Sequence, residues 1–258
     1  MVCQNCEKDF EGNYCHNCGQ KSTVERITFL GLLSEAFYEV IHFEKKEGFL
    51  KTVKVLTFDP GKSIRSYLEG KRKKLYPSSK YLFFIGAIAT ILTLRYHFFS
   101  HNVHELPLED LLYSSKEFLI NFSIYVEEYT TIINIITIPV FTLFSWVFFR
   151  YSGKNYAENL ILNTYITAHQ LALIIVFAPF FEFFPAMKDP ILIPLYVVLT
   201  LVYNYWVLKD FFGVAGISEH ARVVLAIFYS YIGQLIVNLI VFYLLHQLSP
   251  GVCPIMFF

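Results

Sequence analysis

Residues 131–149 read TIINIITIPVFTLFSWVFF and contain no charged side chain. A helix needs about 20 predominantly apolar residues to cross the roughly 30 Å hydrocarbon core of a bilayer, so this stretch predicts a transmembrane helix. Four further apolar runs of similar length lie at 79–98, 159–181, 190–208 and 223–246. The sequence therefore predicts an all-α integral membrane protein with about five transmembrane helices.

The composition of the 258-residue chain supports this fold class. Hydrophobic residues make up 55% of the chain, charged residues only 16%, and the mean hydropathy is +0.47. A water-soluble domain of this size normally has fewer apolar and more charged residues. The first residues are polar and do not resemble a cleavable signal peptide, so we expect the first span to act as its own insertion signal.

Basic residues are distributed asymmetrically. Residues 1–80 hold 14 of the 21 Lys and Arg, and the second and fourth connections between spans add two basic residues each. The other side has two in all. Because cytoplasmic segments of membrane proteins are enriched in Lys and Arg, we expect a cytoplasmic N-terminus and, after five spans, a C-terminus outside.

Four of the five cysteines form two CxxC pairs, Cys3 with Cys6 and Cys15 with Cys18. Two residues between thiolates allow one tight turn to direct both sulfurs at one ion, and two such turns complete a tetrahedral zinc site. We predict a zinc ribbon over residues 1–22 that holds a structural Zn²⁺, because four cysteine ligands leave no open coordination position. A redox-active dithiol pair, or four metal-free thiols, is the alternative.

Residues 23–78 are predicted to form a cytoplasmic segment before the membrane domain at 79–258. Within it, 27–43 has apolar residues at helical spacing and predicts an amphipathic helix. The segment ends in a basic run, Lys71, Arg72, Lys73 and Lys74. Such a run attracts anionic lipid by about 1 kcal/mol per charge, so we expect contact with lipid headgroups and do not expect nucleic acid as a partner.

Polar residues recur inside the predicted spans. The set that we expect to form a polar seam consists of Asn163, His169 and Gln170 in the third span and Gln234 and Asn238 in the fifth. Such side chains usually join helices at about 1 kcal/mol each. The alternative is a site for a small polar solute, an ion or a lipid headgroup, in which His169 would be the titratable group.

Other motifs give little support for catalysis. His97, His101 and His104 share a helical face and could hold a second metal, although solvated histidines are the simpler interpretation. A nucleophile elbow, a zinc-protease helix, a phosphate-binding glycine loop and a dinucleotide fingerprint are all missing, so no catalytic residue is predicted. The chain also lacks the internal repeat that many secondary transporters carry.

Three sequence blocks resemble a bacterial membrane family of unknown function. These are YCHNCGQ at 14–20, GFLKTVKVLTFDPGKSIRSYLEGKRKK at 48–74 and NYAENLILNTYITAHQ at 155–170. The resemblance extends over essentially the whole chain, and its most specific part is the PGKSIRSYLEGKR block. It implies a zinc ribbon, about five spans and a location in the bacterial inner membrane, and it leaves the activity open. Asn159 departs from the family pattern, in which a histidine often follows the residue matching Glu158.

Three functions remain open. The first is a non-enzymatic protein that docks or organises a cytoplasmic protein partner through its ribbon. The second is a small-solute or ion transporter that uses the polar seam. The third is a membrane enzyme that acts on lipid.

Overall fold

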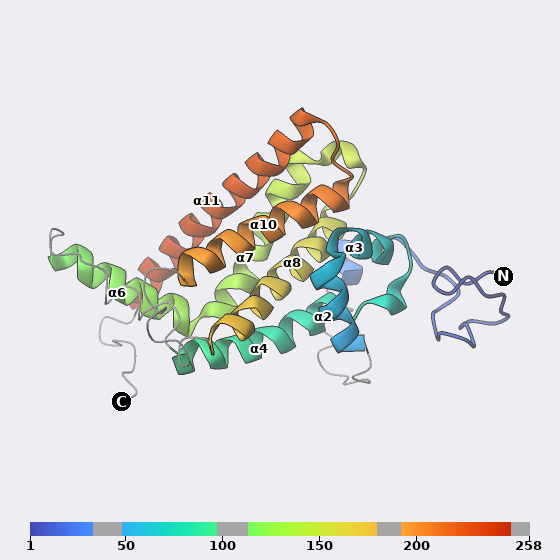
Figure 1. The fold of residues 1–258 in the computed structure, drawn as a ribbon, viewed down its shortest axis with the longest axis horizontal. Helices are drawn as coiled ribbons and strands as arrows, with labels where there is room; N and C mark the ends of the chain where they lie inside the picture. The colour runs from blue at the N-terminus through green and yellow to red at the C-terminus, as the bar shows by residue number, and fades with distance from the viewer. Residues whose placement is uncertain (33–47, 97–112, 180–191, 249–258) are drawn as a thin grey trace.

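The computed structural model describes residues 1–32, 48–96, 113–179 and 192–248, which are mainly helical (Figure 1). Two short helices, α2 (Phe49–Phe58) and α3 (Pro60–Leu68), and a 3-10 turn, η2 (Arg72–Lys74), follow the N-terminal ribbon. The remaining elements are α4 (Ser78–Tyr96), α6 (Tyr113–Glu128), α7 (Thr130–Phe148), η3 (Arg150–Ser152), α8 (Tyr156–Phe177), α10 (Leu192–Phe212) and α11 (Ile217–Leu248).

Within the described residues, four helical segments are long and apolar enough to cross a membrane. They are Arg72–Tyr96, Thr130–Phe148, Tyr156–Phe177 and Ile217–Leu245. These segments match the predicted spans at 79–98, 131–149, 159–181 and 223–246, so the all-α membrane fold is confirmed. The span predicted at 190–208 falls on α10, which is not among the four, and its first two residues lie outside the described part of the chain. A fifth span stays a prediction.

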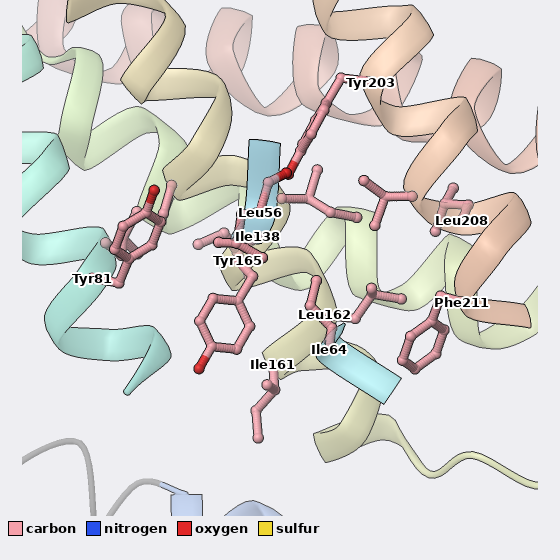
Figure 2. Packing of buried hydrophobic residues seen from close by; sticks show 14 of the residues in the cluster. Leu56, Ile64, Tyr81, Ile138, Ile161, Leu162, Tyr165, Tyr203, Leu208 and Phe211 are labelled. Atoms are coloured by element: carbon pink, nitrogen blue, oxygen red, sulfur yellow. The ribbon is translucent and has the colours of Figure 1, made fainter. Parts of the chain in front are cut away.

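Helix α8 is the central helix of the bundle and packs against α4, α7 and α10. Its residues Ile161, Leu162, Tyr165 and Ile166 are all buried, and Figure 2 shows three of them beside residues from neighbouring helices. Large apolar side chains on α11, including Phe228, Ile236 and Ile240, are instead exposed. Lipid tails are as apolar as these side chains, so such a face is expected on a membrane helix.

Helices α2 and α3 form a helical hairpin that packs beside α8 and α10 (Figure 1). Leu56 and Ile64, one from each helix, are fully buried. Pro60 begins α3, where its missing N–H is not needed. A Cβ atom added to Gly61 would lie 2.6 Å from the Cβ of Asp210 in α10, so the absence of a side chain at Gly61 allows this close approach.

Arg65 in α3 caps the C-terminal end of α10. Its Nε donates to the carbonyl of Phe211 at 2.7 Å, and its Nη2 donates to the carbonyl of Asp210. The last carbonyls of a helix lack partners within the helix and carry partial negative charge, so a guanidinium there is favourable. The PGKSIR part of the sequence is therefore a brace between α3 and α10.

The ribbon and two of the helix connections lie at the same end of the bundle. Arg26 in the segment after the ribbon donates to the carbonyl of Gly153 at 2.7 Å, and Arg65 reaches Phe211 as described. The ribbon, the η2 turn, the α7–α8 connection and the α10–α11 connection thus lie at one end (Figure 1). We call this the ribbon end. Helices α7, α8, α10 and α11 alternate in direction (Figure 1).

The predicted amphipathic helix at 27–43 is described only in part. Residues 29–32 are helical, and residues 33–43 lie outside the described part of the chain. The domain boundaries predicted at residues 22 and 78 stay predictions.

Candidate metal centre

The four sulfur atoms of Cys3, Cys6, Cys15 and Cys18 lie within 4.8 Å of one another. The Sγ atoms of Cys3 and Cys18 are 3.5 Å apart, and those of Cys6 and Cys15 are 3.6 Å apart. Disulfide sulfurs lie about 2.05 Å apart, so these are free thiols. Zn–S bonds of about 2.3 Å in a tetrahedron would place the sulfurs roughly 3.8 Å apart. The four thiols therefore fit a bound metal ion.

The two CxxC pairs form two copies of the same turn, offset by twelve residues. In the first copy, the N–H of Cys3 donates to the carbonyl of Lys8 at 3.0 Å, and the N–H of Glu7 donates to the carbonyl of Cys3 at 2.9 Å. In the second copy, the residues twelve positions later make the same two hydrogen bonds, at 2.8 and 2.7 Å. The site therefore has approximate two-fold symmetry.

The residue after each pair has a positive φ angle, 61° at Glu7 and 69° at Gly19. Glycine adopts this left-handed conformation without the steric cost that other residues bear, so Gly19 suits its position. Antiparallel bridges then join Val2 to Asp9 and Tyr14 to Lys21. Each bridge closes the turn that carries one cysteine pair.

Asn5 and Asn17 precede the second cysteine of their pairs, and each directs its side chain at the opposite turn. Asn17 hydrogen-bonds to the thiol of Cys6, and Asn5 hydrogen-bonds to the thiol of Cys18. The Nζ of Lys8 donates to Oδ1 of Asn17 at 3.0 Å, so the amide nitrogen of Asn17 is available to the sulfur. Groups around the ligands commonly orient them and tune a metal site. Sequence reasoning missed this pair, although the repeated Cys-x-Asn-Cys pattern could have indicated it.

The backbone sets the protonation of the first turn. The N–H of Lys8 lowers the pKa of the Cys6 thiol to about 6, and the N–H of Cys6 lowers the pKa of Cys3. Burial raises the pKa of Cys18 to about 11. Hydrogen bonds from N–H groups thus favour the thiolate of the first pair, which is the form that binds metal.

The basic run predicted to contact lipid lies partly against the ribbon. The Nζ of Lys71 is 3.0 Å from Oε1 of Glu7, and this contact lowers the pKa of the Glu7 carboxyl. The Nη2 of Arg72 donates to the carbonyl of Glu25. Lys73 and Lys74 are exposed. Contact of the run with anionic headgroups stays a prediction, and in this conformation Lys73 and Lys74 are the members most available for it.

The predicted polar seam divides into separate groups. Asn163 donates to Oγ of Ser145 in α7 at 2.9 Å, and that hydroxyl donates to Oδ1 of Asn159 at 3.3 Å. Asn159 and Asn163 also donate to the carbonyls four residues earlier, those of Asn155 and Asn159. This group joins α7 to α8 and is buried.

His169 faces α2 and α4 instead. Its Nε2 is 3.2 Å from Oγ1 of Thr57, and its Nδ1 is 2.9 Å from the hydroxyl of Tyr81. The Thr57 hydroxyl already donates to the carbonyl of Val53, so it must accept from Nε2–H. In the neutral imidazole with its proton on Nε2, the Tyr81 hydroxyl donates to Nδ1. A buried histidine with both nitrogens satisfied is a link between helices.

Gln170 points to a third region, between α8, α10 and α11. Its amide donates to the carbonyl of Thr200 at 3.3 Å and lies 3.5 Å from the hydroxyl of Tyr231, which also accepts from Asn204 at 2.9 Å. One and two turns further along α11, Gln234 and Asn238 are half-buried. Neither makes a side-chain hydrogen bond to the part of the chain that the structure describes.

His97, His101 and His104 lie outside the described residues, so their proposed grouping is untested.

Comparison with known proteins yields one match. A family model with the description "Protein of unknown function (DUF3667)" matches residues 47–90. No curated protein and no solved structure matches the chain. The matched residues comprise α2, α3, η2 and most of α4, and they include the helix that braces α10 and the turn that contacts the ribbon. The match supports the predicted relationship to a family of unknown function over this part of the chain.

Proposed function

We propose that the protein is a non-enzymatic membrane protein that docks or organises a cytoplasmic protein partner through a zinc ribbon held at the ribbon end of its helix bundle. The observation that carries this proposal is the four-thiol site, which uses every ligand position of a tetrahedral ion. Such a closed site is structural, because it leaves no position for a substrate or an activated water. Zinc is the metal that best suits four thiolates in a tetrahedron.

Two features support a cytoplasmic position for the ribbon. The ribbon end carries Lys154, Lys209 and Arg222 in addition to the basic run, and cytoplasmic ends of membrane helices are enriched in such residues. Reduced thiols also persist in the cytoplasm of a cell. The inner membrane of a bacterium is the location implied by the family resemblance.

The ribbon has exposed apolar side chains that are available to a partner. Val2 and Tyr14 occupy matching positions before the two cysteine pairs, and they are 63% and 64% exposed. Met1, which precedes Val2 in the sequence, is 66% exposed. Exposed aromatic and aliphatic side chains on a rigid module are typical anchors of protein interfaces.

A site-specific crosslinking experiment tests this proposal. A photoreactive phenylalanine analogue replaces Tyr14 in one variant and exposed Lys54 of α2 in another, and both are irradiated in native membranes. We expect a defined protein adduct from position 14 alone, lost when Cys15→Ser and Cys18→Ser are added. Zinc content of the purified protein is measured in parallel, with about one ion per chain expected. Absence of zinc, or a position-14 adduct that survives the cysteine changes, contradicts the proposal.

Transport through the polar seam is a second candidate, favoured by Gln234 and Asn238. A half-buried amide without a partner in the described residues is costly unless a ligand, water or another residue completes it. The hydrogen bonds of Asn163, His169 and Gln170 argue that those three join helices. A solute path would therefore involve the α11 face of Gln234 and Asn238.

A further inference from the structure

We propose that Gln20 is a latch through which metal binding in the ribbon fixes the Gly70–Arg72 turn of the membrane domain, and that loss of the metal releases this turn. The inference rests on the zinc ribbon proposed above. It adds a consequence of metal binding that does not depend on a partner.

Gln20 is 3% exposed, and both the nitrogen and the oxygen of its side-chain amide bond to the Gly70–Arg72 turn. Its Nε2 donates to the carbonyl of Gly70 at 2.8 Å. Its Oε1 accepts from the N–H of Arg72 at 3.2 Å. One side chain therefore satisfies two backbone groups of the turn that leads into α4.

The position of Gln20 depends on the thiol site. The backbone carbonyl of Gln20 accepts from the N–H of Cys15 at 2.8 Å, and Gln20 follows Cys18 by two residues. Apart from the cysteines, Phe10 is the buried residue of the ribbon cluster within the described residues. So small a core cannot hold the turn in place, and the free energy of metal binding must do so.

The two-fold symmetry of the ribbon shows that Gln20 is specialised. Lys8 occupies the matching position in the first turn, where it binds Oδ1 of Asn17 inside the ribbon. Gln20 does not bind Asn5 in the same way, because its amide is used by Gly70 and Arg72. Oδ1 of Asn5 is accordingly buried without a partner in the described residues. The second turn therefore lacks the internal side-chain hydrogen bond of the first turn, and its Gln20 contacts the membrane domain instead.

Other contacts on the turn also come from positions set by the cysteines. A Cβ atom on Gly70 would lie 2.5 Å from Oε1 of Gln4, which lies inside the first CxxC pair. Glu7, which follows that pair, forms the ion pair with Lys71. Loss of the metal would disorganise all of these groups together. Lys71 would then join exposed Lys73 and Lys74 as a free positive charge.

Hydrogen exchange at the Arg72 amide reports the latch directly. The detergent-purified protein is compared with and without a zinc chelator, with bound zinc measured in each sample. We expect the amide to exchange about tenfold faster or more after chelation, because local opening no longer breaks the bond to Gln20. Gln20→Ala should show the same fast exchange while it retains zinc.

Two variants complete the test. Lys8→Ala, at the matching position of the other turn, should retain both zinc and slow exchange. Gly70 has a φ angle of 112°, which a residue with a side chain rarely adopts, so Gly70→Ala strains the turn itself without touching a thiol and should give fast exchange with zinc retained. Unchanged exchange after chelation, or in Gln20→Ala or Gly70→Ala with zinc bound, overturns the latch. A chain that binds no zinc would overturn the ribbon and the latch together, whereas a missing partner adduct leaves the latch standing.

Discussion

Arg26 and Glu158 are separated by 132 residues and form a two-bond ion pair. Nε of Arg26 lies 3.1 Å from Oε1 of Glu158, and Nη2 lies 2.9 Å from Oε2. The Glu158 side chain is 7% exposed, whereas that of Arg26 is 59% exposed. Glu158 also completes a capping box with Asn155 at the start of α8. The pair thus ties the segment after the ribbon to the central helix.

Replacement of Arg26 by Gln should lower stability by about 1–2 kcal/mol, because a mostly buried carboxylate loses its charged partner. The partial exposure of Arg26 keeps the cost below that of a fully buried pair. Thermal unfolding in detergent should show a decrease of roughly 3–6 °C in Tm. Lys21→Gln, at an exposed position at the end of the ribbon, is the control.

The Glu158→Gln background separates this pair from general effects on the segment. There, Arg26→Gln should cause little further loss, since the charge interaction is already gone. An equal loss in both backgrounds would show that the ion pair is not the stabilising contact.

Replacement of Asn17 by Ala should weaken zinc binding about 10–100-fold, because the amide that hydrogen-bonds to the Cys6 thiol is lost. Asn5→Ala should act similarly through Cys18. Competition with a chromophoric zinc chelator measures the affinity. His16→Ala, at an exposed position between Cys15 and Cys18, should leave the zinc affinity unchanged. If all three variants lowered the affinity equally, the loss would come from a change in the loop and not from the asparagine amides.

Four of the five predicted spans and the cysteine cluster are confirmed, and each could be predicted because it depends on local sequence. An apolar run of about 20 residues and a CxxC spacing both have a direct physical meaning without knowledge of the fold. The Arg26–Glu158 pair and the Gln20 latch could not be predicted, since their partners are far apart in the sequence. Only the packed structure brings them together.

The polar seam was only partly predicted for a related reason. Adjacent helix residues point about 100° apart, so His169 and Gln170 contact different neighbours. Their spacing along the sequence places them on one stretch of α8 but does not identify the helices on either side. The α2–α3 hairpin, which places Thr57 against His169, has no transmembrane signal of its own.

Replacement of Gly61 by Ala should force α3 away from α10. The added Cβ would lie 2.6 Å from the Cβ of Asp210 and 2.7 Å from the backbone N of Phe211, and helix backbone cannot move aside locally. Overpacking of this kind typically costs about 1–3 kcal/mol. Gly216→Ala is the matched control, because nothing lies within 4 Å of its added Cβ. Thermal unfolding in detergent should lower Tm for Gly61→Ala alone; equal Tm values would contradict the close packing.

Replacement of Gln170 by Met should cost about 1 kcal/mol, because the carbonyl of Thr200 and the hydroxyl of Tyr231 each lose a donor. Gln234→Met, of similar shape, should leave stability unchanged or raise it, since Gln234 has no partner in the described residues. Thermal unfolding of both variants in detergent distinguishes a structural amide from a free one.

The Gln234→Met variant also decides between packing and transport as the role of Gln234. If Gln234 only packs, cells that carry Gln234→Met should keep every phenotype that depends on this protein. If Gln234 contacts a solute, function should fall while Tm stays at or above that of the wild type. A fall in Tm for Gln234→Met would instead show that its amide has a structural partner. Gln234 would then join helices as Gln170 does, and it would not favour a solute path.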